Sequence, residues 1–156
     1  KMFIGFMILY FLVQLLSLAA SDHDARCNLP IKVKKAECDG LPVERYAYQK
    51  KTGKCVDYYT PDCVDNGRNE FETRKECLQA CNRTSTCLRD GRRNLDHSNQ
   101  GTKFYYYDSD DDFCEEIQVN AKSAKLWPRD NLFRRQQACI RACKPEYKRN
   151  KNSYGI

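Results

Sequence analysis

The sequence predicts a small disulfide-rich α+β fold in which a module of one β-hairpin and one helix occurs twice in tandem. All ten cysteines follow residue 20, and an even number of cysteines in an exported chain indicates a disulfide framework. The cysteines fall into two groups, each ending in a Cys-x3-Cys pair. An aromatic run precedes a cysteine in both groups, as expected for the first strand of a hairpin. Two copies of one module are the simplest account of this pattern.

Residues 1–20 are expected to be a signal peptide. From residue 2 to residue 20 the chain is apolar apart from Gln14 and Ser17, and small residues favour cleavage near Ala19 or Ala20. A membrane anchor is the alternative, because this stretch could just span a bilayer, but no basic cluster follows it. We therefore expect a secreted, extracellular protein.

The first copy is assigned to residues 21–81, where the cysteines are separated by ten, sixteen, seven, thirteen and three residues. Residues 45–49 are expected to form the first strand of a hairpin and residues 56–59 the second. The turn between them contains Gly53, which can adopt a positive φ at low cost. Residues 73–76 have the pattern of a capping box, which predicts the start of a helix.

The second copy is assigned to residues 87–143, after a short polar linker at residues 82–86. Its gaps are twenty-six, twenty-four and three residues. Residues 104–108 are expected to form the first strand of its hairpin, followed by an acidic turn at residues 109–112. Cysteines four apart lie on one face of a helix, so each copy is expected to end in a helix.

The second helix lacks the capping box, since Arg135 stands at the matching place. We expect Asp130 or Asn131 to cap this helix one turn earlier, which would make it the longer of the two helices.

Charge is divided unevenly between the two copies. Residues 21–81 contain eleven basic and eleven acidic residues, whereas residues 82–156 contain fifteen basic and ten acidic residues. A basic half can bind nucleic acid, a heparin-like polyanion or a membrane surface, and export argues against nucleic acid. A glycosaminoglycan or acidic phospholipid could bind to the last helix and to the basic tail at residues 144–156. A solvated tail that binds neither is the alternative. The basic residues concerned are Arg134, Arg135, Arg141, Lys144, Lys148, Arg149 and Lys151.

The chain is not expected to be an enzyme or to hold a metal or cofactor. Its only histidines are His23 and His97, neither lies in a CxxC-type cluster, and the cysteines are assigned to bridges. No combination of acid, base and nucleophile is visible.

The spacing of the first six cysteines resembles that of the Kunitz, or pancreatic-trypsin-inhibitor-like, module. Arg45, Tyr46, Tyr48, Gly53, Asn69, Phe71 and residues 73–76 match its hairpin and helix positions. The sequence alone leaves fifteen pairings open. The resemblance implies the bridges Cys27 to Cys81, Cys38 to Cys63 and Cys55 to Cys77.

The second copy resembles a degenerate Kunitz domain with two bridges, Cys87 to Cys143 and Cys114 to Cys139. It has no counterparts of Cys38 and Cys63, whose bridge joins the two protease-binding loops in the family. Its long loops at residues 88–102 and 119–128 are therefore expected to be mobile.

Two modules, ten cysteines and a basic tail are together similar to the salivary anticoagulants of blood-feeding ticks, which mimic tissue factor pathway inhibitor. The resemblance implies a monomeric inhibitor that uses factor X or Xa as a scaffold and blocks factor VIIa bound to tissue factor. Direct inhibition of thrombin or another single serine protease is one alternative. Binding to an ion channel or receptor through Lys32, Lys34 and Lys35 is another.

In Kunitz inhibitors the residue after the second cysteine fills the primary pocket of the protease. The corresponding loop here is Asp39, Gly40, Leu41 and Pro42. Counting from Cys38 places Asp39 at that position, whereas counting back from Cys55 places Gly40 there. Neither is the basic residue that trypsin-like enzymes prefer, so we expect weak inhibition of trypsin. A scaffold without protease contact is the alternative.

In the second copy a dense acidic cluster with neighbouring tyrosines is expected to bind a basic protease exosite. A solvated turn is the alternative. The exosite-binding residues predicted are Tyr105, Tyr106, Tyr107, Asp108, Asp110, Asp111, Asp112, Glu115 and Glu116. Arg92 and Arg93 occupy a loop without a tethering bridge, so neither is expected to be a well-held inhibitory residue.

Asn82 begins the only N-glycosylation sequon and is expected to be an exposed, glycosylated linker residue. Trp127 is expected to fill the core, with a binding role as the alternative.

Overall fold

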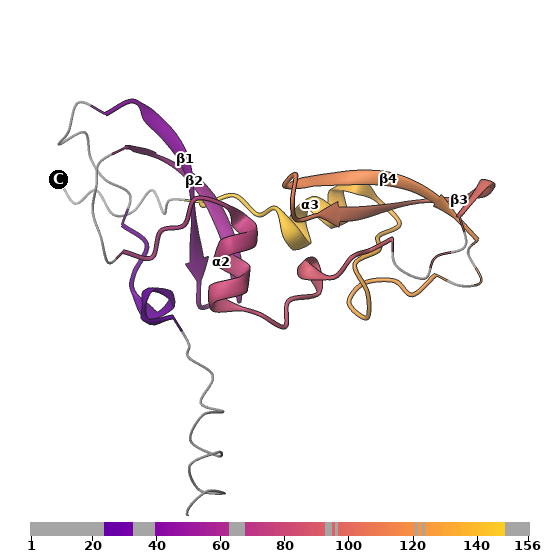
Figure 1. Ribbon diagram of the computed structural model, residues 1–156, viewed down its shortest axis with the longest axis horizontal. Helices are drawn as coiled ribbons and strands as arrows, with labels where there is room; N and C mark the ends of the chain where they lie inside the picture. Colours follow the sequence, from indigo (N-terminus) through magenta and orange to yellow (C-terminus); the bar gives the residue numbers. More distant parts are fainter. Residues whose placement is uncertain are drawn as a thin grey trace, which may run out of the picture.

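The computed structural model describes residues 24–32, 40–62, 68–92, 95, 97–120, 122 and 124–148, and it confirms the small disulfide-rich α+β fold. Within these residues one order of elements occurs twice: a short 3-10 helix, two antiparallel strands and an α-helix (Figure 1). We call residues 24–81 the N-terminal half and residues 82–148 the C-terminal half. None of the described helices has the length and apolar character needed to cross a membrane. The predicted signal peptide lies outside the described residues.

The N-terminal half is built on the predicted hairpin. Strands β1 (Pro42–Gln49) and β2 (Lys54–Pro61) pair from Pro42 opposite Pro61 to Gln49 opposite Lys54. Gly53 has a φ of 69°, and its N–H donates to the carbonyl of Gln49 at 2.9 Å. The turn therefore forms where the sequence predicts it, because glycine adopts a positive φ without steric cost.

Helices begin at capping side chains in this half. The helix α2 (Arg74–Cys81) follows Thr73, whose hydroxyl accepts a hydrogen bond from the N–H of Glu76 at 3.0 Å. The predicted cap is thus confirmed. The 3-10 helix η1 (Ala25–Asn28) is capped in a similar way by the carboxylate of Asp24.

The C-terminal half begins with η2 (Thr86–Leu88) and continues with β3 (His97–Asp108) and β4 (Phe113–Val119). These strands pair around the acidic turn at residues 109–112, as predicted. Asp112 ends the turn with a φ of 49°, a conformation that aspartate tolerates better than most residues.

The prediction for the second helix was wrong. Helix α3 (Gln136–Cys143) has eight residues, the same length as α2, and Arg135 stands at its N-cap without a side-chain hydrogen bond. The chain stays extended before it, because Phe133 pairs with Tyr105 in an isolated bridge. The side chain of Asn131 is engaged elsewhere and does not cap the helix.

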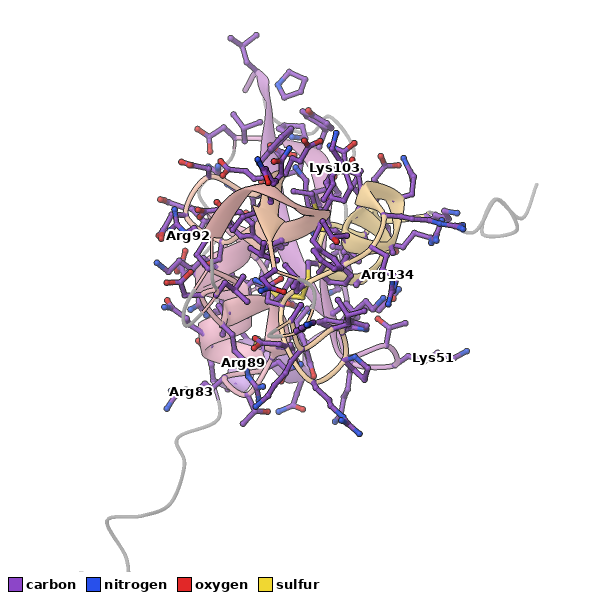
Figure 2. The ribbon with its side chains drawn as sticks, turned by 90° about the vertical axis from the view of Figure 1, so that its right-hand side faces the viewer. Lys51, Arg83, Arg89, Arg92, Lys103 and Arg134 are labelled. Carbon is purple, nitrogen blue, oxygen red and sulfur yellow. A yellow bond between two sulfur atoms is a disulfide. The ribbon has the colours of Figure 1, made fainter. Side chains whose placement is uncertain are left out.

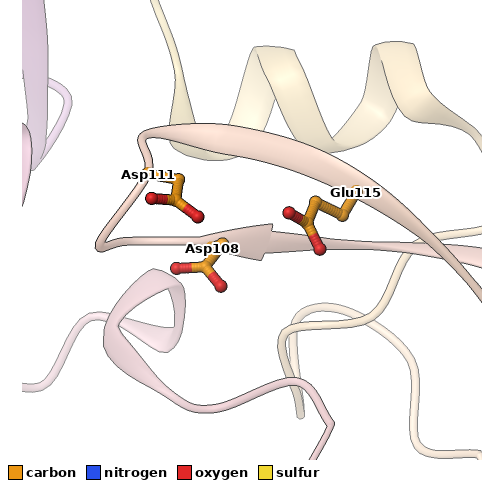
Figure 3. A group of neighbouring side chains, drawn as sticks. All are labelled: Asp108, Asp111 and Glu115. Atoms are coloured by element: carbon orange, nitrogen blue, oxygen red, sulfur yellow. The ribbon is translucent and has the colours of Figure 1, made fainter.

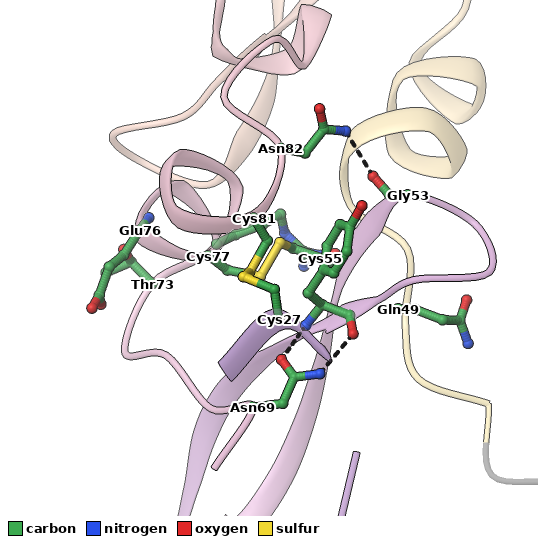
Figure 4. The surroundings of a disulfide bond; sticks show 12 residues. Cys27, Gln49, Gly53, Cys55, Asn69, Thr73, Glu76, Cys77, Cys81 and Asn82 are labelled. Carbon is green, nitrogen blue, oxygen red and sulfur yellow. Dashed lines mark hydrogen bonds between the residues drawn. A yellow bond between two sulfur atoms is a disulfide. The ribbon is translucent and has the colours of Figure 1, made fainter. Parts of the chain in front are cut away.

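Asn131 instead repeats the role of Asn69. The amide of Asn69 accepts from the N–H of Tyr48 at 2.8 Å and donates to its carbonyl at 2.7 Å (dashed in Figure 4). The amide of Asn131 accepts from the N–H of Tyr107 at 3.1 Å and donates to its carbonyl at 2.7 Å. Both asparagines are buried, so each satisfies strand groups that would otherwise lack partners.

Replacing Asn131 with alanine is expected to lower the free energy of unfolding by about 2–4 kcal/mol, because it leaves buried backbone groups of Tyr107 unpaired. The matched control is Asp130→Ala, which removes the other predicted cap and is expected to cost less than about 1 kcal/mol. Chemical denaturation followed by circular dichroism measures both. Equal losses would mean that the buried amide is not the important group.

Four disulfides fix the two halves. The described bridges are Cys27–Cys81, Cys55–Cys77, Cys87–Cys143 and Cys114–Cys139. These pairings are the predicted ones, and Figure 4 shows the surroundings of the first half's bridges. Cys38 and Cys63 lie outside the described residues. Because one buried cluster includes cysteines and aromatic residues of both halves, the two halves share a core.

Candidate protease-binding loop and acidic turn

Residues 40–42 are the described part of the predicted protease-binding loop, at the open end of the β1–β2 hairpin. Leu41 is 81% exposed, the most exposed large apolar side chain of the described residues. Its carbonyl accepts a hydrogen bond from the N–H of Asp62 at 3.2 Å. The Asp62 carboxylate in turn pairs with Arg45 at 2.9 Å. The loop backbone is therefore tied to β2 while Leu41 projects into solvent; Asp39 lies outside the described residues.

Gly40 has no room for a side chain. A Cβ atom added there would lie 2.8 Å from the carbonyl oxygen of Asp62 and 3.0 Å from its nitrogen. Both are backbone atoms, which cannot rotate away. Counting back from Cys55 places Gly40 at the pocket position. Gly40 therefore cannot be replaced by lysine or arginine unless the backbone moves.

The acidic turn does not present all of its predicted residues to solvent. Tyr106 and Tyr107 are buried, Tyr105 is half-buried, and the Asp112 carboxylate lies between the two halves. It accepts hydrogen bonds from the hydroxyls of Tyr46 at 3.1 Å and Tyr107 at 2.7 Å. The exposed part of the predicted site is smaller and consists of Asp110, Asp111 and Glu116.

Arg74 is the central cation of the contact between the halves. Its side chain is 1% exposed, and its Nε donates to Asp112 at 2.9 Å. The guanidinium also pairs with Asp57 and donates to the carbonyl of Cys55 in its own half, and to the carbonyl of Pro145 at 3.2 Å. Its charge is thus compensated by two carboxylates, which a buried arginine requires.

Further contacts join the halves around this ion pair. Lys75 pairs with Asp110 at the surface, and the Lys54 ammonium donates to the carbonyl of Arg141 at 2.8 Å. The N–H of Tyr147 donates to the carbonyl of Asp57 at 3.0 Å. The first residues of the predicted basic tail therefore pack along β2.

Four tyrosines resist ionisation. Burial and a hydrogen bond to Glu115 raise the pKa of Tyr106 to about 12. Burial also raises the pKa values of Tyr46, Tyr58 and Tyr107, with nearby carboxylates adding to the effect.

These shifts predict alkaline unfolding. The stabilisation from each shifted tyrosine is fully present below the unfolded pKa of about 10 and is lost as pH rises toward the folded value. Tyrosinate absorbance and circular dichroism, recorded together, should show these tyrosines ionising late, together with loss of structure. Ionisation of Tyr46, Tyr58, Tyr106 and Tyr107 near pH 10 with the fold intact would contradict this.

Asp108, Asp111 and Glu115 bring their carboxylates together beside the hairpin turn (Figure 3). Two of the three already have protein partners. Asp108 lies 3.7 Å from the Arg92 guanidinium, and Glu115 accepts from Tyr106. Repulsion within the group is thus partly offset by the Arg92 guanidinium and the Tyr106 hydroxyl.

Asn82 is half-buried and not fully exposed as expected. Its Nδ2 donates to the carbonyl of Gly53 at 2.9 Å (Figure 4), and it stands at the C-cap of α2. Trp127 is at the surface, with one face stacked on Phe133 at a centroid distance of 5.1 Å. It therefore covers the core from outside.

Residues 26–82 match the sequence profile of the Kunitz/bovine pancreatic trypsin inhibitor domain. Haemaphysalin from Haemaphysalis longicornis is 31% identical over 126 residues, which cover 79% of this chain and 75% of that protein. The chain belongs to the Kunitz/bovine pancreatic trypsin inhibitor family. A trypsin inhibitor from Bombyx mori is 44% identical over 55 residues, 35% of this chain and 93% of that protein.

Among solved structures, that of ixolaris, from an NMR study of ixolaris and its interaction with factor X, matches this chain with 23% sequence identity and a TM-score of 0.30. That match covers 68% of this chain and 86% of ixolaris.

Kunitz proteins are inhibitors of serine proteases and not enzymes themselves, which agrees with the prediction from the sequence. The Kunitz match includes the whole β1–β2 hairpin, α2 and the loop that carries Leu41. This loop is therefore the first candidate for protease contact. Its described residues include no basic side chain.

The sequence did not reveal the part that Arg74 and Asp57 play in this site. It placed Lys144 with the basic tail, whereas the Lys144 ammonium lies 3.6 Å from the Asp112 carboxylate. Arg74 looks like an ordinary solvent-facing residue in a first helical turn, and its partner Asp112 lies 38 positions away. The one indication in the sequence was the density of negative charge in the acidic turn, which favours pairing of some carboxylates with basic side chains.

Proposed function

We propose that the protein is a secreted serine protease inhibitor with anticoagulant action, which blocks factor VIIa bound to tissue factor and uses factor X or Xa as its scaffold. The proposal treats residues 21–81 and 87–143 as tandem Kunitz domains, the second degenerate. Support comes from the relationship to Haemaphysalin and from the resemblance of the cysteine pattern to tick anticoagulants such as ixolaris.

The observation that carries the proposal is the loop at residues 40–42. Trypsin-like proteases recognise a basic residue through an aspartate in the primary pocket. Here Gly40 leaves no space for a side chain, and Leu41 is the group presented to solvent. Tight binding to a trypsin-like coagulation protease would therefore use contacts outside that pocket, and a scaffold such as factor X or Xa would supply them.

The second domain would supply such contacts. Of the predicted exosite residues, Asp110, Asp111 and Glu116 remain accessible. Asp110 and Glu116 form surface ion pairs with Lys75 and Lys103, which a basic exosite on factor X or Xa would have to replace. Asp112 holds the two halves together, and Asp108 and Glu115 are engaged by Arg92 and Tyr106 of their own half. The exosite contact proposed here is therefore smaller than the sequence suggested.

The test is inhibition of factor VIIa and tissue factor by the refolded chain, with and without active-site-blocked factor Xa. We expect inhibition only when the scaffold is present. Equal inhibition without it, or none in either condition, would contradict the proposal.

Direct inhibition of a single protease is the second candidate, and Leu41 favours it for a protease with an apolar primary pocket. Such an inhibitor slows cleavage of a small chromogenic peptide, whereas an exosite binder mainly slows cleavage of macromolecular substrates. Cleavage of a small chromogenic peptide in the presence of the protein therefore distinguishes the two candidates.

A further inference from the structure

Acidic and basic side chains of the C-terminal half are partly separated, and the acidic ones are largely neutralised. Asp112 pairs with Arg74 and lies 3.6 Å from Lys144. Asp110 pairs with Lys75, and Glu116 pairs with Lys103 at 2.9 Å.

The basic residues beyond β4 are not neutralised in this way. Eight lysines and arginines occur from residue 120 to residue 148, against only Asp130 and Glu146. Lys144 is committed to Asp112. The other seven are exposed, and none is paired with a carboxylate in the described part of the chain: Lys122, Lys125, Arg129, Arg134, Arg135, Arg141 and Lys148.

Four of these cations, Lys122, Lys125, Arg129 and Arg134, lie in the loop before α3, and Arg135 stands at the N-cap of that helix. Arg89 donates to the carbonyl of Arg129 at 2.6 Å, which places a further guanidinium beside the loop. Figure 2 views the molecule from the side of the C-terminal half, where Arg89 and Arg134 extend outward from the ribbon. We call this set, Arg89, Lys122, Lys125, Arg129, Arg134 and Arg135, the basic loop surface.

We propose that the basic loop surface binds a sulfated glycosaminoglycan. Unpaired guanidinium groups at a surface match sulfate groups, which accept two parallel hydrogen bonds from arginine as carboxylates and phosphates do. A linear polyanion can contact several such cations at once. The site lies in the folded loop before α3, and not chiefly in the tail.

A lipid surface fits the described residues less well. The only exposed large apolar side chain of this loop is Trp127, and one of its faces is occupied by Phe133. Binding of this loop to a lipid surface would therefore depend on charge alone and be weakened by salt.

The test is salt elution of the full mature chain from immobilised heparin, compared with sedimentation on vesicles of phosphatidylserine and phosphatidylcholine. The variant is Arg134→Ser with Arg135→Ser. The control, Lys50→Ser with Lys51→Ser, removes the same charge from the turn between β1 and β2. Circular dichroism confirms that both are folded.

We expect wild type to bind heparin at physiological salt and the control to elute with it. The Arg134/Arg135 variant should elute earlier, with its salt dependence reduced by about one released counterion per charge removed. Equal shifts in both variants would show a net-charge effect only, and stronger binding to vesicles would assign the surface to lipid. Either result, or elution of wild type below physiological salt, would overturn the proposal.

Discussion

Replacing Arg74 with methionine is expected to lower the free energy of unfolding by about 3–5 kcal/mol, because it leaves the partly buried Asp57 without its cation and the partly buried Asp112 with Lys144 alone. Methionine keeps much of the volume of the side chain, so the loss reports mainly the charge and its hydrogen bonds. Since Arg74 contacts both halves, the effect should include loosening of the C-terminal half. Equilibrium unfolding in urea measures the loss, and small-angle scattering reports the separation of the halves.

Lys75→Met is the matched control. Lys75 follows Arg74 in the same helix and also pairs with a carboxylate of the acidic turn, but at the surface. Exposed ion pairs contribute less than about 1 kcal/mol. Similar losses for both substitutions would show that the buried position of Arg74 has no special importance.

Removing the disulfide Cys114–Cys139 by alanine at both positions is expected to cost about 3–4 kcal/mol, the value for a loop with this sequence separation of 25. This bridge ties α3 to β4, and both cysteines are buried in the shared core. The measurement is thermal unfolding under non-reducing conditions.

The comparison variant lacks Cys55–Cys77, which closes a loop with a sequence separation of 22 in the N-terminal half. Because the halves share one core, we expect a similar loss and a single transition in both variants. Two separate transitions would contradict a shared core, and a loss of only a few tenths of a kcal/mol would contradict the assigned role of the bridge.

The sequence predicted those parts of the fold that depend on local chemistry or on family spacing. Thr73 caps α2, and Gly53 closes the first turn with a positive φ. The four described disulfides follow the pairing that the Kunitz resemblance implied.

The start of α3 could not be predicted in this way. Asp130 and Asn131 are good capping residues, but the Asn131 amide binds Tyr107 on a strand more than twenty residues earlier. A tertiary hydrogen bond thus took precedence over a local preference, and α3 begins without a side-chain cap.

The candidate site was predicted least completely. Exposure of charged residues was inferred from their density, yet the side chains of Asp112 and Arg74 meet inside the molecule. Such a contact depends on how the two modules pack, which no local pattern indicates. The lack of space at Gly40 likewise depends on the approach of Asp62 across the hairpin.

The central claim is that the loop end at residues 40–42 contacts the protease. Leu41→Asp tests it most directly, with Tyr59→Asp as the control, since Tyr59 is another exposed apolar residue of the same hairpin. Inhibition of factor VIIa and tissue factor is measured with active-site-blocked factor Xa present. We expect inhibition by Leu41→Asp to be weaker by about tenfold or more, or about 1.4 kcal/mol, and inhibition by Tyr59→Asp to be unchanged. Undiminished inhibition by Leu41→Asp would contradict it.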